Sequence, residues 1–296
     1  MREMHQFSAA EWLRLVPVAQ GLRQLRNDLL LARYLQARPP ELAAFLQQQR
    51  HLAGRPVAIV IAFEQPWALD WQLRMAARNL PGTQLLVFDN SRTEAARSMI
   101  RKVCEAHAVP WLGLPVYRTR HVNRSHGMAM SWVYHNVVSA LQPEIFGYLD
   151  HDLIPVAPVD LAGRLREQPV FGMLNAGNGA HWSLWAGYCF YRHAYTAGKP
   201  LSFLYDFSRE LDTGGRNWNP LYRGLDRAAL RFAPQEFVPL RPPAQPEPRK
   251  VEIVDRAWVH VGGVSYNDNF EKKHAFFEGI KQALDTGARW EDLAVA

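Results

Sequence analysis

The sequence predicts an α/β domain with a mainly parallel sheet flanked by helices, preceded by an N-terminal helical extension. Val57 to Phe63 form a continuous apolar run rich in β-branched side chains, which is typical of a parallel strand buried on both faces. From there to residue 155, segments of strand and helix character alternate, and this alternation favours a parallel sheet. A chain of 296 residues has room for one large domain, or for one domain with an appendage.

Residues 1–54 form the predicted extension. Leucines recur at helical spacing between residues 13 and 35, arginines lie among them, and a second helix is expected at 41–49 after Pro39-Pro40. We interpret these helices as a cap packed on the main domain. The alternatives are a homo-oligomer interface and a basic amphipathic surface that rests on anionic lipid.

Residues 55–296 form the predicted catalytic domain, with a nucleotide-binding half at 55–155 and an acceptor-binding half at 156–296. Strands are expected at 57–63, 85–88, 109–114 and 146–150, and helices at 67–79, 93–107 and 125–141. After residue 155 the pattern is less regular. It includes an aromatic cluster between residues 182 and 195 and a strand-like segment at 251–261.

Composition and charge indicate which partners and which cellular compartment to expect. The net charge of +6 comes from scattered basic residues without dense tracts, so we expect no nucleic-acid partner. Cys104 and Cys189 are too few for a disulfide framework, and no zinc-ligand spacing occurs. No secretory signal is evident, and no apolar run approaches the ~20 residues that span a bilayer. We therefore expect a cytoplasmic protein, with peripheral contact at the inner face of the membrane as an alternative.

The most informative segment is the apolar run that ends in Asp150 and Asp152. Side chains alternate along a strand, so the two carboxylates are expected on the same side of the strand end. Like charges this close repel, and a divalent cation such as Mn²⁺ or Mg²⁺ relieves the repulsion. Such a cation typically binds together with a phosphate-bearing ligand. The alternative, non-functional interpretation is a pair of solvated carboxylates in a turn.

Polar residues also follow two other predicted strands. Glu64 comes directly after the first strand, and Asp89 ends the second. Ligands of open α/β sheets bind at the carboxyl ends of the strands, so these residues and the aspartate pair are expected at one site. A helix-capping role is the alternative for Asp89.

The order of these features resembles the GT-A fold of nucleotide-sugar-dependent glycosyltransferases, a Rossmann-like fold, and is most similar to the inverting family-two group. The resemblance covers roughly residues 56–265. It rests on four separated motifs: Ala62-Phe63-Glu64, Val87-Phe88-Asp89-Asn90-Ser91, Asn123-Arg124-Ser125-His126-Gly127 and Tyr148-Leu149-Asp150-His151-Asp152. The last motif is similar to the family's Asp-x-Asp metal signature.

The resemblance implies a donor site for a nucleoside diphosphate sugar with Mn²⁺ or Mg²⁺. Asp89 would hold the base, Asp150 would reach the ribose or the metal through water, and Asp152 would bind the metal. His260, in a strand-to-glycine turn, is similar to a C-terminal metal ligand of many such enzymes. The residues expected to bind the donor are Ala62, Phe63, Glu64, Asp89, Asn123, Gly127 and Asp150.

The resemblance also implies a catalytic base beyond the metal motif, in an acidic pair at the start of a helix, and this sequence departs from the family in having no clear Glu-Asp pair there. Asp212, followed by Thr213-Gly214-Gly215, is the first candidate, and Asp206 is the second. With this assignment, we expect an inverting hexosyltransferase. Its acceptor would be a hydroxyl group of a glycan, a lipid-linked molecule or a small molecule. If neither residue is the base, a retaining mechanism becomes the alternative.

Two other functions share parts of this pattern. A nucleotidyltransferase on a related fold usually has a basic, glycine-rich loop after the first strand, and Phe63 to Trp67 lack it. A haloacid-dehalogenase-type phosphatase requires a hydroxyl residue where Ile154 stands. A non-catalytic GT-A-like binding or scaffold domain remains the non-enzymatic alternative.

Overall fold

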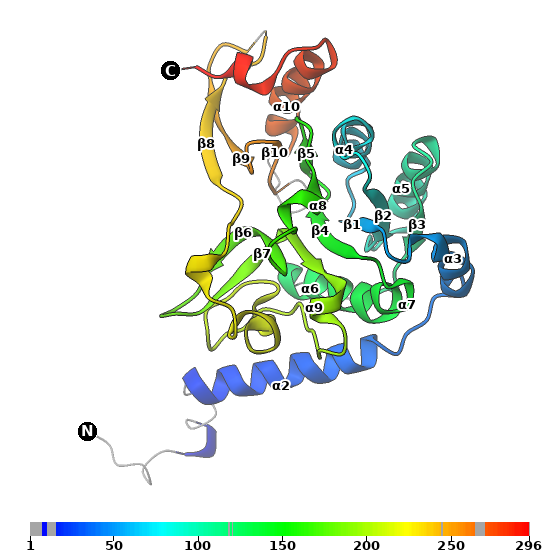
Figure 1. Cartoon of the computed structure of the whole chain (residues 1–296), viewed down its shortest axis with the longest axis vertical. Coiled ribbons are helices and arrows are strands. Elements are labelled where there is room, and N and C mark those ends of the chain that lie inside the picture. Colours follow the sequence, from blue (N-terminus) through cyan, green and yellow to red (C-terminus); the bar gives the residue numbers. More distant parts are fainter. Residues whose placement is uncertain are drawn as a thin grey trace.

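The computed structural model describes residues 8–10, 16–117, 119, 121–243, 245–263 and 270–295. Two sheets form its framework, and helices cover them (Figure 1). Residues 1–7 and 11–15 of the predicted N-terminal extension lie outside this description. None of the helices in the described part is both long and apolar enough to cross a bilayer.

The larger sheet has six strands in the order β3-β2-β1-β4-β7-β6. Its first four strands are parallel, whereas β7 runs antiparallel to both β4 and β6. The strands are β1 (Pro56–Ala62), β2 (Gln84–Asp89), β3 (Trp111–Gly113), β4 (Ile145–Asp150), β6 (Val170–Ala176) and β7 (Trp182–Arg192). The predicted α/β class, with a mainly parallel sheet flanked by helices, is confirmed.

Side-chain alternation along β1 separates two cores. Val57, Ile59 and Ile61 belong to one cluster of buried residues, whereas Ala58 and Val60 belong to another on the opposite face. Strand β1 is therefore buried on both sides, as its unbroken apolar sequence predicts.

Helices α4 and α5 pack on the second of these faces, and α6 packs on the first. The helices of this domain are α4 (Pro66–Asn79), α5 (Glu94–Ala106), α6 (Val122–Val133), α7 (Ser139–Leu141), α8 (Leu161–Arg164) and α9 (His193–Thr196). Thr93 caps α5 by accepting a hydrogen bond from the amide of Ala96 at 3.2 Å. A π-helical turn at 134–138 joins α6 to α7, so the predicted helix at 125–141 begins three residues earlier and changes its winding.

The N-terminal helices lie against the same core as β1. Helix α2 (Val16–Tyr34) runs along one side of the domain, and α3 (Leu42–Gln49) packs near the parallel end of the sheet (Figure 1). Leu31, Tyr34 and Phe45 are buried in the cluster that contains Val57. These helices act as a cap in the described region, and the boundary at residue 54 stays a prediction.

The second sheet is antiparallel, in the order β5-β10-β9-β8. Its strands are β5 (Leu153–Pro155), β8 (Gln235–Leu240), β9 (Arg249–Val254) and β10 (Trp258–His260), and α10 (Phe270–Asp285) packs on it. The strand-like segment at 251–261 is thus two paired strands. They reverse at Asp255 and Arg256, whose φ angles are 51° and 53°. The sequence does not signal this turn, because neither residue is Gly or Asn.

Short helical segments complete the described chain. They comprise 3₁₀ turns at Arg50–Leu52, Gly215–Asn217, Arg227–Ala229 and Trp290–Leu293, and a π turn at Trp218–Tyr222.

Gly127 marks the closest approach of α6 to the segment after α9. A Cβ added at this position would overlap the carbonyl oxygen of Phe203 and lie 3.0 Å from its carbonyl carbon. Backbone atoms cannot move aside as the end of a flexible side chain can. Glycine at this position is therefore explained by helix packing.

We expect Gly127→Ala to lower the free energy of unfolding by about 1–3 kcal/mol, because the added methyl group forces α6 away from Phe203. Chemical denaturation monitored by circular dichroism measures the change.

Gly21→Ala, in α2, is the matched control. No atom lies within 4 Å of its added Cβ, so it should raise stability by about 0.5–1 kcal/mol through helix propensity. Equal stabilisation by both substitutions would contradict the packing argument.

Candidate active site

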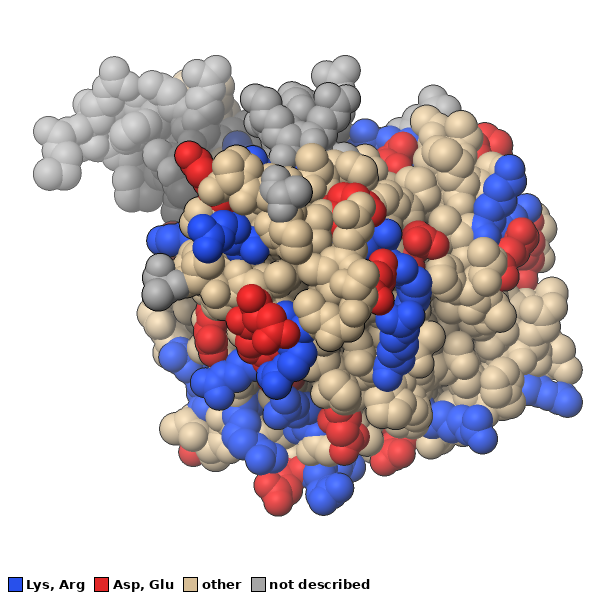
Figure 2. Space-filling model, turned by 90° about the horizontal axis from the view of Figure 1, so that it is seen from above, with Lys and Arg blue, Asp and Glu red and all other residues tan. Residues whose placement is uncertain are grey.

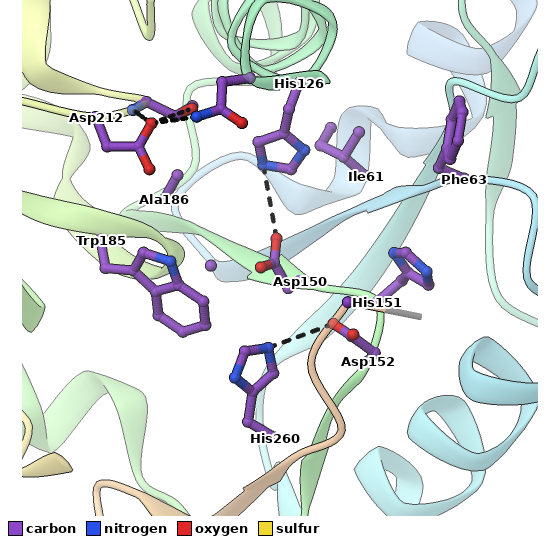
Figure 3. A pocket seen from close by; sticks show the side chains of 14 residues that line it. Ile61, Phe63, His126, Asp150, His151, Asp152, Trp185, Ala186, Asp212 and His260 are labelled. Atoms are coloured by element: carbon purple, nitrogen blue, oxygen red, sulfur yellow. Dashed lines mark hydrogen bonds and ion pairs between the residues drawn. The ribbon is translucent and has the colours of Figure 1, made fainter. Parts of the chain in front are cut away.

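A cavity of about 270 Å³ opens at the carboxyl end of β4 (Figure 3). Residues of both sheets and of α6 contribute to its walls. It is lined by Ile61, Phe63, Asn123, His126, Asp150, His151, Asp152, Trp185, Ala186, Gly187, Asp212, Thr213, His260 and Gly263.

The two aspartates lie where the chain passes from one sheet to the other. Asp150 is the last residue of β4, and Asp152 immediately precedes β5. The side-chain amide of Gln72, from α4, donates to the carbonyl oxygens of Asp150 at 2.7 Å and Leu153 at 2.8 Å. Gln72 is fully buried, so it fixes the crossover from inside the protein. Both carboxylates line the same cavity, as the sequence predicts, although Asp152 stands in a turn.

His260 reaches Asp152 because β10 pairs with β5. In this antiparallel register His260 is opposite Leu153, and the amide of Val261 donates to the carbonyl of Asp152 at 3.0 Å. The His260 Nε2 lies 3.7 Å from Asp152 Oδ1. Potential ligand atoms of Asp150, Asp152 and His260 all lie within 4.8 Å of one another. Three residues that are distant in the sequence thus form one cluster.

Glu252 orients the His260 ring. It is opposite His260 in the β9–β10 pair, and its Oε2 lies 2.6 Å from Nδ1. A proton on Nδ1 is donated to this carboxylate, which leaves Nε2 directed at Asp152. Histidines that bind metals usually have such a carboxylate on the second ring nitrogen. The Trp185 ring also packs against His260, with its centroid 5.0 Å away.

The negative charges of the cluster favour a protonated His260. Burial lowers the pKa of His260, but hydrogen bonds and charges from Asp152 and Glu252 outweigh burial and raise it to about 10. Burial and the neighbouring Asp152 raise the pKa of Asp150 to about 6. In the absence of a cation, the cluster therefore keeps a proton at neutral pH.

His126 approaches Asp150 from the opposite side. Its Nε2 lies 3.6 Å from Asp150 Oδ1 and makes no hydrogen bond within the described part of the chain. Burial lowers the pKa of His126 to about 4, so the ring is neutral. An imidazole in this state keeps one nitrogen that donates and one that accepts.

The cluster fits a divalent cation. Carboxylate oxygens suit Mg²⁺ and Mn²⁺, and a neutral imidazole adds a nitrogen ligand that Mn²⁺ also accepts. Gly187 keeps the approach to Asp150 open, since an added Cβ would lie 2.5 Å from Asp150 Oδ2. The ligand roles of Asp150, Asp152 and His260 remain predictions, now supported by their proximity.

Asp212 stands on the cavity wall away from His260 (Figure 3). Its Oδ1 accepts hydrogen bonds from Asn123 Nδ2 at 2.6 Å and from the amide of Thr213 at 2.7 Å. Asp206, the second candidate base, is buried and paired with Arg209 at 2.6 Å. Burial acts against ionisation of Asp206, but hydrogen bonds from Ser208 and Arg209 lower its pKa overall. Asp206 therefore has a structural role, and Asp212 is the candidate that faces the cavity.

Only some of the predicted donor-binding residues line the cavity. Phe63, Asn123 and Asp150 do, whereas Gly127 packs against Phe203, as described above. The Ala62 carbonyl accepts from the amide of Asn90 at 2.9 Å, which joins the ends of β1 and β2.

Glu64 and Asp89 both accept hydrogen bonds from backbone amides of the loop that follows β2. Glu64 has a φ of 60°, and its Oε1 accepts from the amide of Arg92 at 2.8 Å. Asp89 Oδ1 accepts from the amide of Ser91 at 2.8 Å, and the side chain is fully buried. Burial raises the pKa of Asp89 despite the hydrogen bonds from Ser91. Asp89 does not line the cavity, and its role in base binding stays a prediction.

Sequence reasoning missed three contributors to the site. Glu252 is one of three charged residues of β9, and its pairing with His260 depends on the hairpin. His126 belongs to the motif at 123–127, but its position next to Asp150 follows from the packing of α6. Trp185 belongs to the aromatic cluster, in which Trp182 is buried in the core and Trp185 lines the cavity.

No family model and no curated protein matches the chain. Among solved structures, the chain is similar to the mannosyltransferase PcManGT from Pyrobaculum calidifontis in complex with GDP-Man and Mn²⁺, with 14% identity and a TM-score of 0.36. That match covers 64% of this chain and 59% of the mannosyltransferase. TarS of S. aureus is 13% identical with a TM-score of 0.35, and 50% of this chain aligns with 30% of TarS. Glucosyl-3-phosphoglycerate synthase from Mycobacterium tuberculosis, solved with Mn²⁺, UDP and glucosyl-3-phosphoglycerate, is 14% identical with a TM-score of 0.37, and 56% of this chain aligns with 66% of it. This chain thus spans less than two thirds of the length of each of these proteins.

Proposed function

We propose that the protein is a metal-dependent glycosyltransferase that moves a sugar from a nucleoside diphosphate donor to a hydroxyl acceptor. The observation that carries the proposal is the convergence of Asp150, Asp152 and His260 in one cavity, with Asp212 on another part of its wall. Two carboxylates and a histidine suit a cation that binds a diphosphate. A separate carboxylate suits the deprotonation of an acceptor.

Asp150, Asp152 and His260 would hold the cation. A bound Mn²⁺ or Mg²⁺ supplies Lewis-acid stabilisation of the charge on the departing diphosphate. Glu252 keeps the Nε2 of His260 directed at the site, and Trp185 limits rotation of the ring by packing against it. The neutral His126 offers a hydrogen bond to a ligand next to Asp150.

Asp212 would act as the general base. Asn123 and the amide of Thr213 bind its Oδ1, so Oδ2 is left to accept the proton of the acceptor hydroxyl. The hydroxyl oxygen then forms a bond to the anomeric carbon while the bond from that carbon to the diphosphate oxygen breaks. A single displacement of this kind inverts the configuration of the sugar. Asn123 therefore acts as a positioning residue for the base.

Metal-dependent nucleotide binding tests the role of Asp152. We expect Mn²⁺ together with a nucleoside diphosphate to raise the melting temperature of the wild type, and Asp152→Asn to abolish this shift because it removes a charged ligand. A thermal-shift panel of nucleoside diphosphates and nucleotide sugars, with and without Mn²⁺, measures it.

Asp70→Asn is the matched control, since Asp70 is an exposed carboxylate on α4 that pairs with His107 outside the cavity. It should keep the full shift. Absence of a Mn²⁺-dependent shift in the wild type for every nucleotide would refute the proposed function, whereas an unchanged shift in Asp152→Asn would exclude Asp152 as a ligand.

Metal binding should release protons, because a cation displaces the proton that Asp152 and Glu252 hold on His260. With the pKa of His260 near 10, the apparent affinity for Mn²⁺ rises with pH across the neutral range. It rises by up to about tenfold per pH unit for one displaced proton. Titration calorimetry in buffers of different ionisation enthalpy counts the protons released.

Glu252→Gln removes one of the charges that raise the pKa of His260. We expect it to reduce proton release per bound Mn²⁺ and to weaken binding by roughly 10–100-fold at high pH, where His260 is neutral in both proteins. The control is Glu236→Gln, which changes an exposed carboxylate of β8 that pairs with Arg256. It should change neither the proton release nor the affinity for Mn²⁺. Unchanged proton release in Glu252→Gln would show that Glu252 does not govern the charge of His260.

Turnover tests the role of Asp212. Asp212→Asn should lower kcat by roughly 10²–10⁴-fold, because an amide cannot take up the proton, while donor affinity stays close to that of the wild type. The assay is Mn²⁺-dependent release of nucleoside diphosphate from the nucleotide sugar that gives the largest thermal shift. Asn123→Ala should give a smaller loss of kcat. Equal turnover in Asp212→Asn and the wild type would remove Asp212 as the base.

A further inference from the structure

Helix α2 presents an apolar stripe to solvent. Val18, Leu22, Leu25 and Leu29 are 38%, 47%, 56% and 64% exposed. Their spacing of four, three and four residues places them on one face of the helix. The other large exposed hydrophobic residues in the described chain, Met99, Val116 and Phe237, are dispersed over α5, a loop and β8. The described surface thus has one continuous apolar stripe, and it belongs to α2.

Between Gln24 and Asp28 the opposite face of α2 is polar and packs on the domain, whereas Leu31 and Tyr34, farther along the helix, are buried in the core. Gln24 Nε2 donates to Asp206 Oδ1 at 2.9 Å, and Asn27 Nδ2 donates to the hydroxyl of Tyr205 at 3.0 Å. Asp28 pairs with Arg216. A surface helix normally turns its apolar face inward. In this segment of α2 the polarity is reversed, so domain packing does not account for the outward leucines.

The exposed charged residues of α2 are basic, and one of them, Arg23, lies over the Phe207 ring. Arg23, Arg26 and Arg33 are exposed, and the single acidic residue of α2, Asp28, is already paired with Arg216. Two copies of the chain that met through this stripe would bring their arginines together without an acidic partner on either helix. An anionic surface would instead complement them. The charge therefore favours lipid headgroups over a second copy.

The face of the molecule seen from above does not share this pattern (Figure 2). On the face seen from above in Figure 2, Lys and Arg stand beside Asp and Glu. The combination of outward leucines and exposed arginines is the pattern of helices that lie in the plane of a membrane interface. We propose that the outer face of α2 docks the protein on an anionic lipid bilayer.

One segment of chain connects the inner face of α2 with the candidate active site. Tyr205 and Asp206 bind the inner face of α2, and the backbone of Asp206 pairs with Leu211, the residue before Asp212. A bilayer on the outer face would be about one helix diameter, ~10 Å, from this segment. This inference concerns the surface alone and holds whether or not the cavity takes a nucleotide sugar.

Vesicle co-sedimentation of the full chain tests the proposal. We expect binding to vesicles of phosphatidylcholine mixed with phosphatidylglycerol, and roughly tenfold weaker binding to phosphatidylcholine alone. Salt should weaken the anionic binding, because it screens the arginines. Absence of binding to the anionic vesicles would overturn the proposal.

Two sets of variants separate the leucines from the arginines. Combined glutamine substitution of Leu22, Leu25 and Leu29 should abolish binding to both kinds of vesicle. Combined glutamine substitution of Arg23, Arg26 and Arg33 should remove the preference for anionic vesicles. If circular dichroism shows that the triple leucine variant does not fold, Leu29→Gln alone replaces it, because Leu29 is the most exposed of the leucines. This single substitution should still weaken binding to vesicles.

Matched controls lie on other elements. Met99→Gln replaces a comparably exposed apolar residue of α5, and combined glutamine substitution of Arg223, Arg227 and Arg256 removes three exposed arginines from other parts of the surface. Both should bind like the wild type. Equal loss in the controls would overturn the assignment to α2. A lipid-free dimer in sedimentation velocity that the leucine substitutions dissociate would overturn the choice of lipid and identify a second copy as the partner.

Discussion

The pairing of β10 with β5 is the constraint on which the candidate site depends. It places His260 opposite Leu153 and binds the carbonyl of Asp152, so a strand from the C-terminal part of the chain meets the end of β4. Gln72 holds the same crossover from the other side through two carbonyl oxygens. Without these backbone contacts, nothing would bring His260 to the two aspartates at the end of β4. With them, they share a cavity with an oriented histidine.

The electrostatics of the site follow from this convergence. Asp152 and Glu252 flank one buried imidazole; burial lowers the pKa of His260, but the hydrogen bonds and charges of these two carboxylates outweigh burial and raise it to about 10. Burial and the charge of Asp152 raise the pKa of Asp150 to about 6, although the neighbouring His260 acts in the opposite direction. A group of carboxylates under these conditions gains from any positive charge, whether a proton or a divalent cation. A proton and a metal ion therefore compete for binding to this cluster of side chains. His126, which is kept neutral by burial, stands outside this competition and offers a hydrogen bond.

Asp206 and Asp212 are near each other in the sequence, but one carboxylate has a structural role and the other faces the cavity. Asp206 is buried and bound by Gln24, Ser208 and Arg209, so its carboxylate serves the attachment of α2 and the folding of its own loop. Asp212 stands six residues later with one oxygen fixed and faces the cavity. The polar residues of α2 that would ordinarily face water are used for this attachment. The leucines of the helix are consequently turned outward.

The sequence by itself determined the α/β alternation, the buried strand β1 and the strand end that carries Asp150 and Asp152. These features are local, because apolar runs, helical spacing and chain order specify them over a few residues. Only the tertiary structure decided that Glu252 orients His260, that Asn123 binds Asp212, that Gly127 packs on Phe203 and that Asp89 is buried. Each of these contacts joins residues that are brought together by sheet register or helix packing. No local pattern encodes such pairings, since they depend on how the two sheets and α6 fit against one another.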